Sequence, residues 1–205
     1  MFKRVKADKR SKSLRRLVFG VGKNDSWYKT SVMINGKLER CDIYKVWVHM
    51  LERCYSEKYQ ERFESYKDAL VCDEWLLFSN FLKWAEPRWK KGFHLDKDIK
   101  GLGCKIYSPE NCIFLSPRIN GLFIDSKSRR GNLPLGISIQ NGKFKVSCSD
   151  GSRQVHVGYY KNISDASSAY KSFKAKVVKE AVKGLDDVTG NLVLEYAKYY
   201  LGDEY

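Results

Sequence analysis

The chain has 205 residues, of which 43% are hydrophobic, so it can build packed cores and is not a wholly disordered protein. It carries 38 basic and 24 acidic residues, a net charge of +14 at neutral pH. Its apolar runs are far shorter than the ~20 residues that cross a bilayer, and its first residues lack the apolar stretch of a secretory signal. We therefore expect a cytoplasmic protein with no membrane partner, whose six cysteines, without CxxC spacing, are reduced thiols.

The positive charge is concentrated in two segments. Residues 1–42 hold 12 basic and 4 acidic residues, and residues 125–183 hold the same numbers. Residues 43–124 are nearly neutral, and residues 184–205 are acidic. Because aromatic and basic residues are interleaved in both basic segments, we expect contact with nucleic acid rather than only a solvated basic surface.

In the first part of the chain, short strands and two helices are predicted. Apolar residues at a spacing of three and four, together with turn and breaker residues, define these elements. The second helix begins after Asp73 as its cap and ends at Pro87. In chain order we expect a flexible basic arm (1–16), short strands with a hairpin turn at Asn35-Gly36 (17–42), helices at 43–55 and 74–85, a strand at 94–99 and a short helix after Ser116-Pro117.

After a polar linker at 125–132 the apolar period changes to two, which is typical of strands. Strands are predicted at 135–139, 143–148 and 154–158, followed by a helix at 164–182 capped by Ser164 and a last helix at 189–201. Asn141-Gly142 and Asp150-Gly151 are hairpin dipeptides that join the strands. Alternation places seven residues on the face that packs against the helix: Ile137, Ile139, Phe144, Val146, Cys148, Val155 and Val157.

Three strings in the middle of the chain occur in a recognisable order: His94-Leu-Asp-Lys-Asp-Ile99, Tyr107-Ser-Pro-Glu-Asn-Cys112 and Ser116-Pro-Arg-Ile-Asn120. Together with the upstream pattern at 44–55 and Val71-Cys-Asp-Glu-Trp75, they resemble the HNH (His-Me finger) nuclease core over residues 40–124. The resemblance implies that Asp96 and Asn120 hold one divalent metal ion and that Asn111 orients the attacking water. Oxygen donors of this kind suit Mg²⁺ or Mn²⁺.

The sequence departs from the family pattern at the catalytic base, where Lys97 replaces histidine. A lysine with an ordinary pKa is protonated at neutral pH, so Lys97 is expected to bind phosphate or stabilise charge rather than abstract a proton. On a strand, His94, Asp96 and Asp98 share a face, so His94 either substitutes as base or ligand or is only a surface histidine. Asn111 either orients water or simply caps a turn.

Zinc is not expected, although Cys54, Cys72, Cys104 and Cys112 lie near the nuclease-like strings. Their wide and irregular spacing differs from that of zinc sites and favours four buried thiols.

Residues 129–183 resemble the APETALA (ethylene-response-factor) type of DNA-binding domain. The resemblance is carried by Arg130-Gly-Asn-Leu-Pro-Leu-Gly-Ile137, Gly142-Lys-Phe144, Val157-Gly-Tyr-Tyr160 and Ala166-Ser-Ser-Ala-Tyr170. It implies a three-stranded sheet whose polar face lies in the major groove of duplex DNA. The family's base-contacting Arg and Trp positions hold mainly Ser, Gln and His here, so phosphate contacts are expected to dominate. The candidate DNA-binding residues are Arg129, Arg130, Ser138, Gln140, Lys143, Lys145, Ser147, Ser149, Arg153, Gln154 and His156.

The predicted fold class is α+β: an HNH-like ββα-metal core with flanking helices, followed by a three-stranded antiparallel sheet packed on one helix. The expected divisions are a basic arm and hairpin (1–42), the HNH-like domain (43–124), the APETALA-type domain (125–183) and a C-terminal helix with an acidic tail (184–205).

The two resemblances together are typical of phage homing-endonuclease-like proteins, which act in the infected bacterial cell. They imply a metal-dependent endonuclease or nickase that cleaves double-stranded DNA. Two alternatives remain open: a degenerate nuclease scaffold that binds DNA as a regulator without cleaving it, and an RNA or ribonucleoprotein binder.

Overall fold

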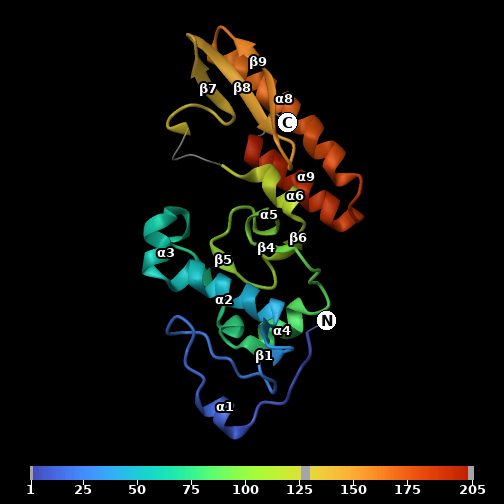
Figure 1. Cartoon of the computed structure of the whole chain (residues 1–205). Coiled ribbons are helices and arrows are strands. Elements are labelled where there is room, and N and C mark those ends of the chain that lie inside the picture. Colours follow the sequence, from blue (N-terminus) through green and yellow to red (C-terminus); the bar gives the residue numbers. More distant parts are fainter. Residues whose placement is uncertain (1, 126–129, 203–205) are drawn as a thin grey trace. The chain divides into compact units, whose positions relative to one another are not determined.

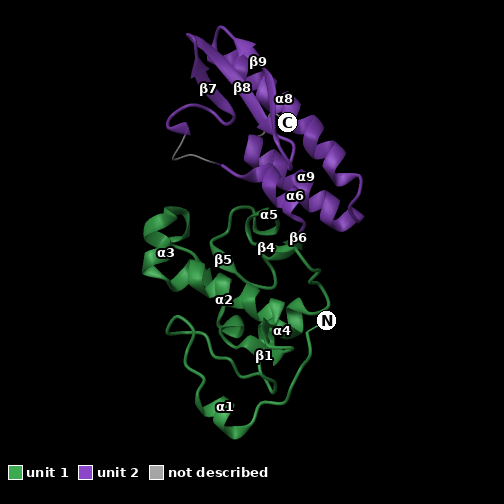
Figure 2. Cartoon of the chain, viewed as in Figure 1, with its two compact units in different colours: residues 1–114 green, residues 115–205 purple. Residues whose placement is uncertain are grey.

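The computed structural model describes residues 2–125 and 130–202 of a mixed α+β chain. Two compact units divide it, residues 1–114 and residues 115–205 (Figure 2). The boundary falls inside the segment 43–124 that the sequence analysis treats as one domain. Each unit is described by itself below, with element labels as in Figure 1.

The N-terminal arm of the first unit is ordered, so the prediction of a flexible arm is wrong. It contains the short helix α1 (Lys9–Ser13). The guanidinium of Arg15 donates to three backbone oxygens, those of Asn24, Ser26 and Tyr28, at 2.9, 2.7 and 2.9 Å. Carbonyl groups that converge on one cation hold it in place, which its position in a basic run does not reveal.

The predicted hairpin and first long helix are confirmed. Strands β1 (Ser31–Ile34) and β2 (Lys37–Arg40) pair antiparallel around Asn35 and Gly36. Both turn residues have positive φ, 48° and 73°, as a type I′ turn requires. Helix α2 (Asp42–Tyr55) follows directly. Its apolar face buries Trp47, whose indole N–H donates to the Trp75 carbonyl oxygen at 2.7 Å.

The helix predicted at 74–85 is instead two short helices, η2 (Asp73–Leu76) and α4 (Phe78–Ala85), and Asp73 does not cap either of them. The break is at Leu77, whose backbone is extended (φ −92°, ψ 124°). Around it, the N–H of Lys23 donates to Leu76 O at 2.7 Å and the N–H of Phe78 donates to Lys23 O at 3.0 Å. Pairing with a distant segment therefore overrides local helix propensity here.

Short elements complete the first unit around this core. Strand β4 pairs with β6, at whose end the first unit gives way to the second, and β3 pairs in parallel with β5. The bounds are α3 (Glu57–Arg62), η1 (Glu64–Tyr66), β3 (Leu70–Val71), β4 (His94–Asp96), α5 (Asp98–Gly101), β5 (Ile106–Tyr107) and β6 (Ile113–Leu115).

The second unit contains the predicted three-stranded antiparallel sheet packed on a helix (Figure 1). The strands lie in the order β7-β8-β9, and α8 packs against their inner face through Ala166 and Tyr170. Asn162, not Ser164, caps α8 by accepting from the N–H of Asp165. The bounds are α6 (Pro117–Asn120), η3 (Gly121–Phe123), β7 (Ile137–Gln140), β8 (Lys143–Ser149), β9 (Gln154–Tyr160), α8 (Ile163–Val182) and α9 (Asp187–Leu201).

One of the residues predicted to pack against the helix does not do so: Ile139 is 63% exposed, although its pairing with Phe144 keeps it on the inner face. The core under the sheet is made by Ile137, Val146 and Cys148 with the residues of α8. Ile139 lies one pleat farther along the edge strand β7, close to its end at the Asn141-Gly142 turn and outside this buried cluster.

A β-bulge changes which side chains of β9 face outward. Val146 pairs with Gly158, but the next residue of β8, Ser147, pairs with His156. The extra residue on β9 is Val157, and beyond it the alternation resumes with the opposite phase. Tyr159 consequently pairs with Lys145 and shares its outward face.

Gly136 at the start of β7 is required by its backbone and by a close neighbour. Its φ is +71°, and a Cβ there would lie 2.2 Å from the Tyr170 ring and 2.6 Å from the Ser147 carbonyl oxygen. We expect Gly136→Ala to lower the free energy of unfolding by about 3 kcal/mol, because strain at positive φ adds to overpacking against backbone. Denaturant unfolding measures this, with Gly184→Ala, which meets open space, as the control. Equal stability of the two variants would contradict the prediction.

Candidate functional site

Asp96, which belongs to the first of the nuclease-like strings, lies at the end of β4. Its Oδ1 accepts the backbone N–H groups of Asp98 and Ile99 at 3.0 and 2.8 Å. These bonds turn the chain out of the strand and into α5, so the strand predicted at 94–99 ends at Asp96. Asp98 therefore lies on a helix and does not share a strand face with His94 and Asp96, which corrects that part of the prediction.

Charge is buried around the end of β4. Burial raises the pKa of the Asp96 carboxyl group, and the neighbouring Asp98 raises it further. Lys97 is only 5% exposed; its ammonium forms an ion pair with Asp98 Oδ1 and lies 5.9 Å from the centre of the Tyr107 ring. A lysine that is ion-paired as its ammonium has no lone pair to accept a proton, so this geometry does not favour Lys97 as a general base.

A second cation lies in the same cluster. Arg53, near the end of α2, donates to the Tyr107 hydroxyl at 3.4 Å and lies over the Tyr66 ring at 5.7 Å. Burial raises the pKa of both tyrosines. Neither Arg53 nor Tyr107 is predicted to be functional from the sequence, although both occur in the motifs quoted above. Arg53 and Lys97 thus both interact with Tyr107, and Lys97 is the direct neighbour of Asp96 in the chain.

The other predicted catalytic residues have separate surroundings. His94 is exposed and shares the face of β4 with Asp96 by strand alternation. The Asn111 amide donates to Ile106 O at 3.1 Å and to the Cys104 sulfur at 3.3 Å, so it supports the loop before β6. Asn120 ends α6, which belongs to the second unit, so a metal ion shared with Asp96 stays a prediction.

The chemistry of Asp96 is compatible with a hard divalent metal ion. Both backbone hydrogen bonds to its carboxylate use Oδ1, so a metal ion would be bound through Oδ2. Within residues 2–125 and 130–202, no group of three or more His, Cys, Asp or Glu side chains converges as a complete metal site. The six cysteines are free thiols, and burial raises the pKa of Cys54 to about 12.

The outer face of the β7–β8–β9 sheet gathers most of the predicted DNA-binding residues, and we call it the outer sheet face. Cross-strand pairs place Ser138 beside Lys145, Ser147 beside His156, and Ser149 beside Gln154. Its members are Ser138, Gln140, Lys143, Lys145, Ser147, Ser149, Gln154, His156 and Tyr159. Strand pairing thus brings together, on one surface, residues from three sequence segments.

Tyr159 is a member of this face that the sequence analysis missed. It is 50% exposed, its ring centre lies 4.8 Å from that of His156, and its hydroxyl donates to Gln140 Oε1 at 3.2 Å. Strict alternation from His156 would turn the Tyr159 side chain inward. Its outward position follows only from the β-bulge, which the sequence pattern does not reveal. The hydrogen bond to Gln140 spans β8 and braces the two outer strands.

Three predicted basic residues lie at the margins. Arg130 donates to both carboxylate oxygens of Asp125 at 2.9 and 2.8 Å and to the Leu133 carbonyl, so its guanidinium is already engaged. Arg153 lies in the turn before β9, with its side chain 82% exposed and 3.5 Å from Asp150 Oδ2. Arg129 lies outside the described residues.

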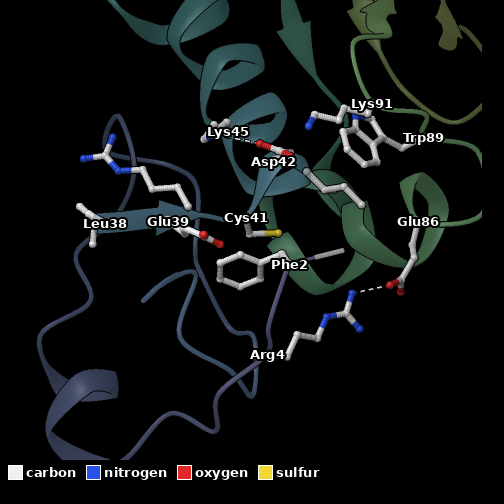
Figure 3. Close-up of a pocket in the computed structure, with 12 residues that line it drawn as sticks. Phe2, Arg4, Leu38, Glu39, Cys41, Asp42, Lys45, Glu86, Trp89 and Lys91 are labelled. Atoms are coloured by element: carbon white, nitrogen blue, oxygen red, sulfur yellow. Dashed lines mark hydrogen bonds and ion pairs between the residues drawn. The ribbon is translucent and has the colours of Figure 1, made fainter. Parts of the chain in front are cut away.

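A cavity of about 790 Å³ lies in the first unit (Figure 3). It is formed by the N-terminal segment, β2, the start of α2 and the 86–91 loop. Most of its charged side chains pair with one another: Arg4 with Glu86, and Lys45 with Asp42 at 2.8 Å. This pairing gives the cavity no strong preference for an anion or a cation.

No helix in the described part of the chain is both long and apolar enough to span a membrane. Comparison with protein-family models, with curated proteins and with solved structures finds no match for this chain.

Proposed function

We propose that the protein binds double-stranded DNA through the outer sheet face of its second unit. The observation that carries this proposal is the composition of that face: hydrogen-bonding and cationic side chains on three paired strands, with an apolar core beneath them. A sheet surface of this kind can enter the major groove, and hydroxyl and amide groups can contact base edges there.

The distribution of charge on the face supports phosphate contacts at its margins. Lys143 and Lys145 lie towards the β7–β8 turn, and Arg153 lies in the β8–β9 turn at the opposite end. Neutral side chains, among them Ser147 and His156, occupy the region between them. Cations at both ends would contact the backbone and position the neutral residues over the bases.

Binding is expected to weaken steeply with salt. If about six phosphates are neutralised, the logarithm of the association constant falls with the logarithm of salt concentration at a slope near −5, because each contact releases condensed counterions. Fluorescence anisotropy of a labelled duplex at several salt concentrations measures the slope. A flat response would contradict an electrostatic interface.

We further propose that the first unit is an HNH-type endonuclease or nickase centre, with a binding-only regulator as the alternative. The supporting observation is the carboxylate of Asp96, held at the end of β4 with His94 on the same strand face. The next residue, Lys97, is a buried cation, and its cluster also contains Arg53. A bound Mg²⁺ or Mn²⁺ ion would polarise the scissile phosphate. His94 would accept the proton of the attacking water, while Lys97 and Arg53 would stabilise charge on the phosphate oxygens.

Lys97→His tests the altered base position. If the lysine marks a lost general base, an imidazole there is expected to raise divalent-dependent nicking by roughly 10²-fold, because it titrates near neutral pH. Nicking is measured on supercoiled plasmid in the presence of Mg²⁺, Mn²⁺ or EDTA. His94→Ala in the otherwise wild-type protein tests whether His94 acts as the base instead. Absence of nicking by the wild type and by Lys97→His would leave the binding-only function.

A further inference from the structure

A small cavity of about 270 Å³ lies in the second unit beside the start of β7, where β8 extends past β7 and is paired with β9 alone. At this point the N–H of Ser147 donates to Gly136 O, the last backbone contact before the edge of β8 becomes free of β7. Four polar residues of the outer sheet face also line the cavity: Ser138, Ser147, Ser149 and Gln154. The cavity therefore opens onto the proposed DNA-binding surface.

Its wall contains a buried cation. Lys174 of α8 is 1% exposed, and its ammonium donates to Ser149 O at 3.1 Å and lies 5.9 Å from the centre of the Phe123 ring. Burial lowers the pKa of Lys174. The Cys148 thiol and the charge of Asp150 act against this lowering. Within the described residues, however, Lys174 forms no ion pair with a carboxylate, and Asp150 is paired with Arg153. A buried ammonium without a counterion is costly unless an anion reaches it.

The rest of the lining favours an anion. Ser138, Ser147 and Ser149 supply hydroxyl donors, and Gln154 supplies an amide. The other charged residues of the cavity, Arg130 and Asp125, neutralise each other in a bidentate ion pair. The uncompensated charge of the lining is thus the single positive charge of Lys174.

We infer that this cavity is a phosphate-binding pocket, with Lys174 as its cation and the hydroxyl groups of Ser138, Ser147 and Ser149 as hydrogen-bond donors. The phosphate comes either from a nucleic-acid backbone or terminus or from a free phosphate compound. Only the nucleic-acid source depends on the proposed function, because the pocket's chemistry selects the phosphate group itself.

Titration of the full chain with inorganic phosphate tests the pocket. Amide NMR shifts at Ser138, Ser147 and Ser149 report binding. Lys174→Met keeps the aliphatic stem but removes the charge, and it is expected to weaken phosphate binding at least tenfold. Lys176→Met, an exposed lysine of the same helix, is the matched control and is expected to leave binding unchanged.

A second pair of variants covers the case in which Lys174→Met fails to fold. Ser147→Asp places a negative charge at the cavity from the solvent-facing side of β8 and is expected to abolish phosphate binding, whereas Ser168→Asp on the exposed surface of α8 is not. The inference is overturned if the wild type shows no response up to about 50 mM phosphate, the range of very weak binding, or if Ser147→Asp binds as the wild type does.

The same titrations separate the two phosphate sources and the two proposals. Competition between inorganic phosphate and a DNA duplex, lost in Lys174→Met, supports a nucleic-acid phosphate in the pocket. Phosphate binding without such competition supports a free phosphate compound. If no duplex binds at all but phosphate still does, the proposed DNA-binding function fails while the pocket stands.

Discussion

Asp96→Asn is expected to reduce divalent-dependent DNA cleavage by roughly 10³-fold, while DNA binding changes little. A metal ion that activates the scissile phosphate contributes several kcal/mol to the transition state, and each 1.36 kcal/mol is tenfold in rate. The asparagine side-chain oxygen can still accept the N–H groups of Asp98 and Ile99, so the turn into α5 is retained. Loss of cleavage would then reflect the lost negative charge and not a disordered loop.

Plasmid cleavage and duplex binding are measured side by side for this variant. Asp96→Ala removes the hydrogen-bond acceptor as well and is expected to lose cleavage together with some stability. Asp68→Asn, at an exposed turn residue, serves as the matched control. Full cleavage by Asp96→Asn would place the catalytic centre elsewhere in the protein.

Replacing Lys143, Lys145 and Arg153 together by alanine is expected to weaken duplex binding by roughly 100-fold and to make the salt slope shallower by about 3. Each lost phosphate contact removes one released counterion from the binding equilibrium. The loss is expected to be similar for unrelated DNA sequences, because phosphate contacts carry no base information. The weak surface pair between Arg153 and Asp150 contributes little to stability, so the fold is expected to persist.

A variant of equal charge keeps this test specific. Three exposed lysines lie on other surfaces: Lys176 on α8, Lys183 in the turn after α8, and Lys198 on α9. Replacing these three by alanine removes the same amount of positive charge. If binding depends on the outer sheet face, this control loses far less affinity. Equal losses in the two triple variants would show that net charge, and not the sheet, governs binding.

Local sequence patterns were sufficient to predict two long helices and two hairpin turns. Helix α2 and helix α8 follow from apolar residues at a spacing of three and four. The hairpins at Asn35-Gly36 and Asn141-Gly142 follow from residues that tolerate positive φ, and the structure shows it at all four. These preferences act between residues a few positions apart, so they survive in any tertiary context that does not oppose them.

Two of the errors occurred where a partner distant in the chain competes with the local preference. Lys23 pairs with the segment around Leu77 and divides the predicted helix, and backbone carbonyls bind Arg15 and order the predicted flexible arm. Asp96 ends its strand by accepting two N–H groups, a choice that the alternating pattern does not encode. In each case two or three hydrogen bonds outweigh a propensity of a few tenths of a kcal/mol.

The sequence by itself determined the α+β class, the polar face of the second unit and the identity of most candidate residues, because composition and period depend only on neighbouring positions. Tertiary structure alone decided that Lys97 is buried in an ion pair, that Tyr159 faces outward and that Lys174 lines a cavity. The bulge at Val157, opposite Val146 and Ser147, and the start of β7 after Gly136 produced the last two outcomes. Both depend on strand register, which is set by the packing of three strands on one helix and not by any short stretch of residues.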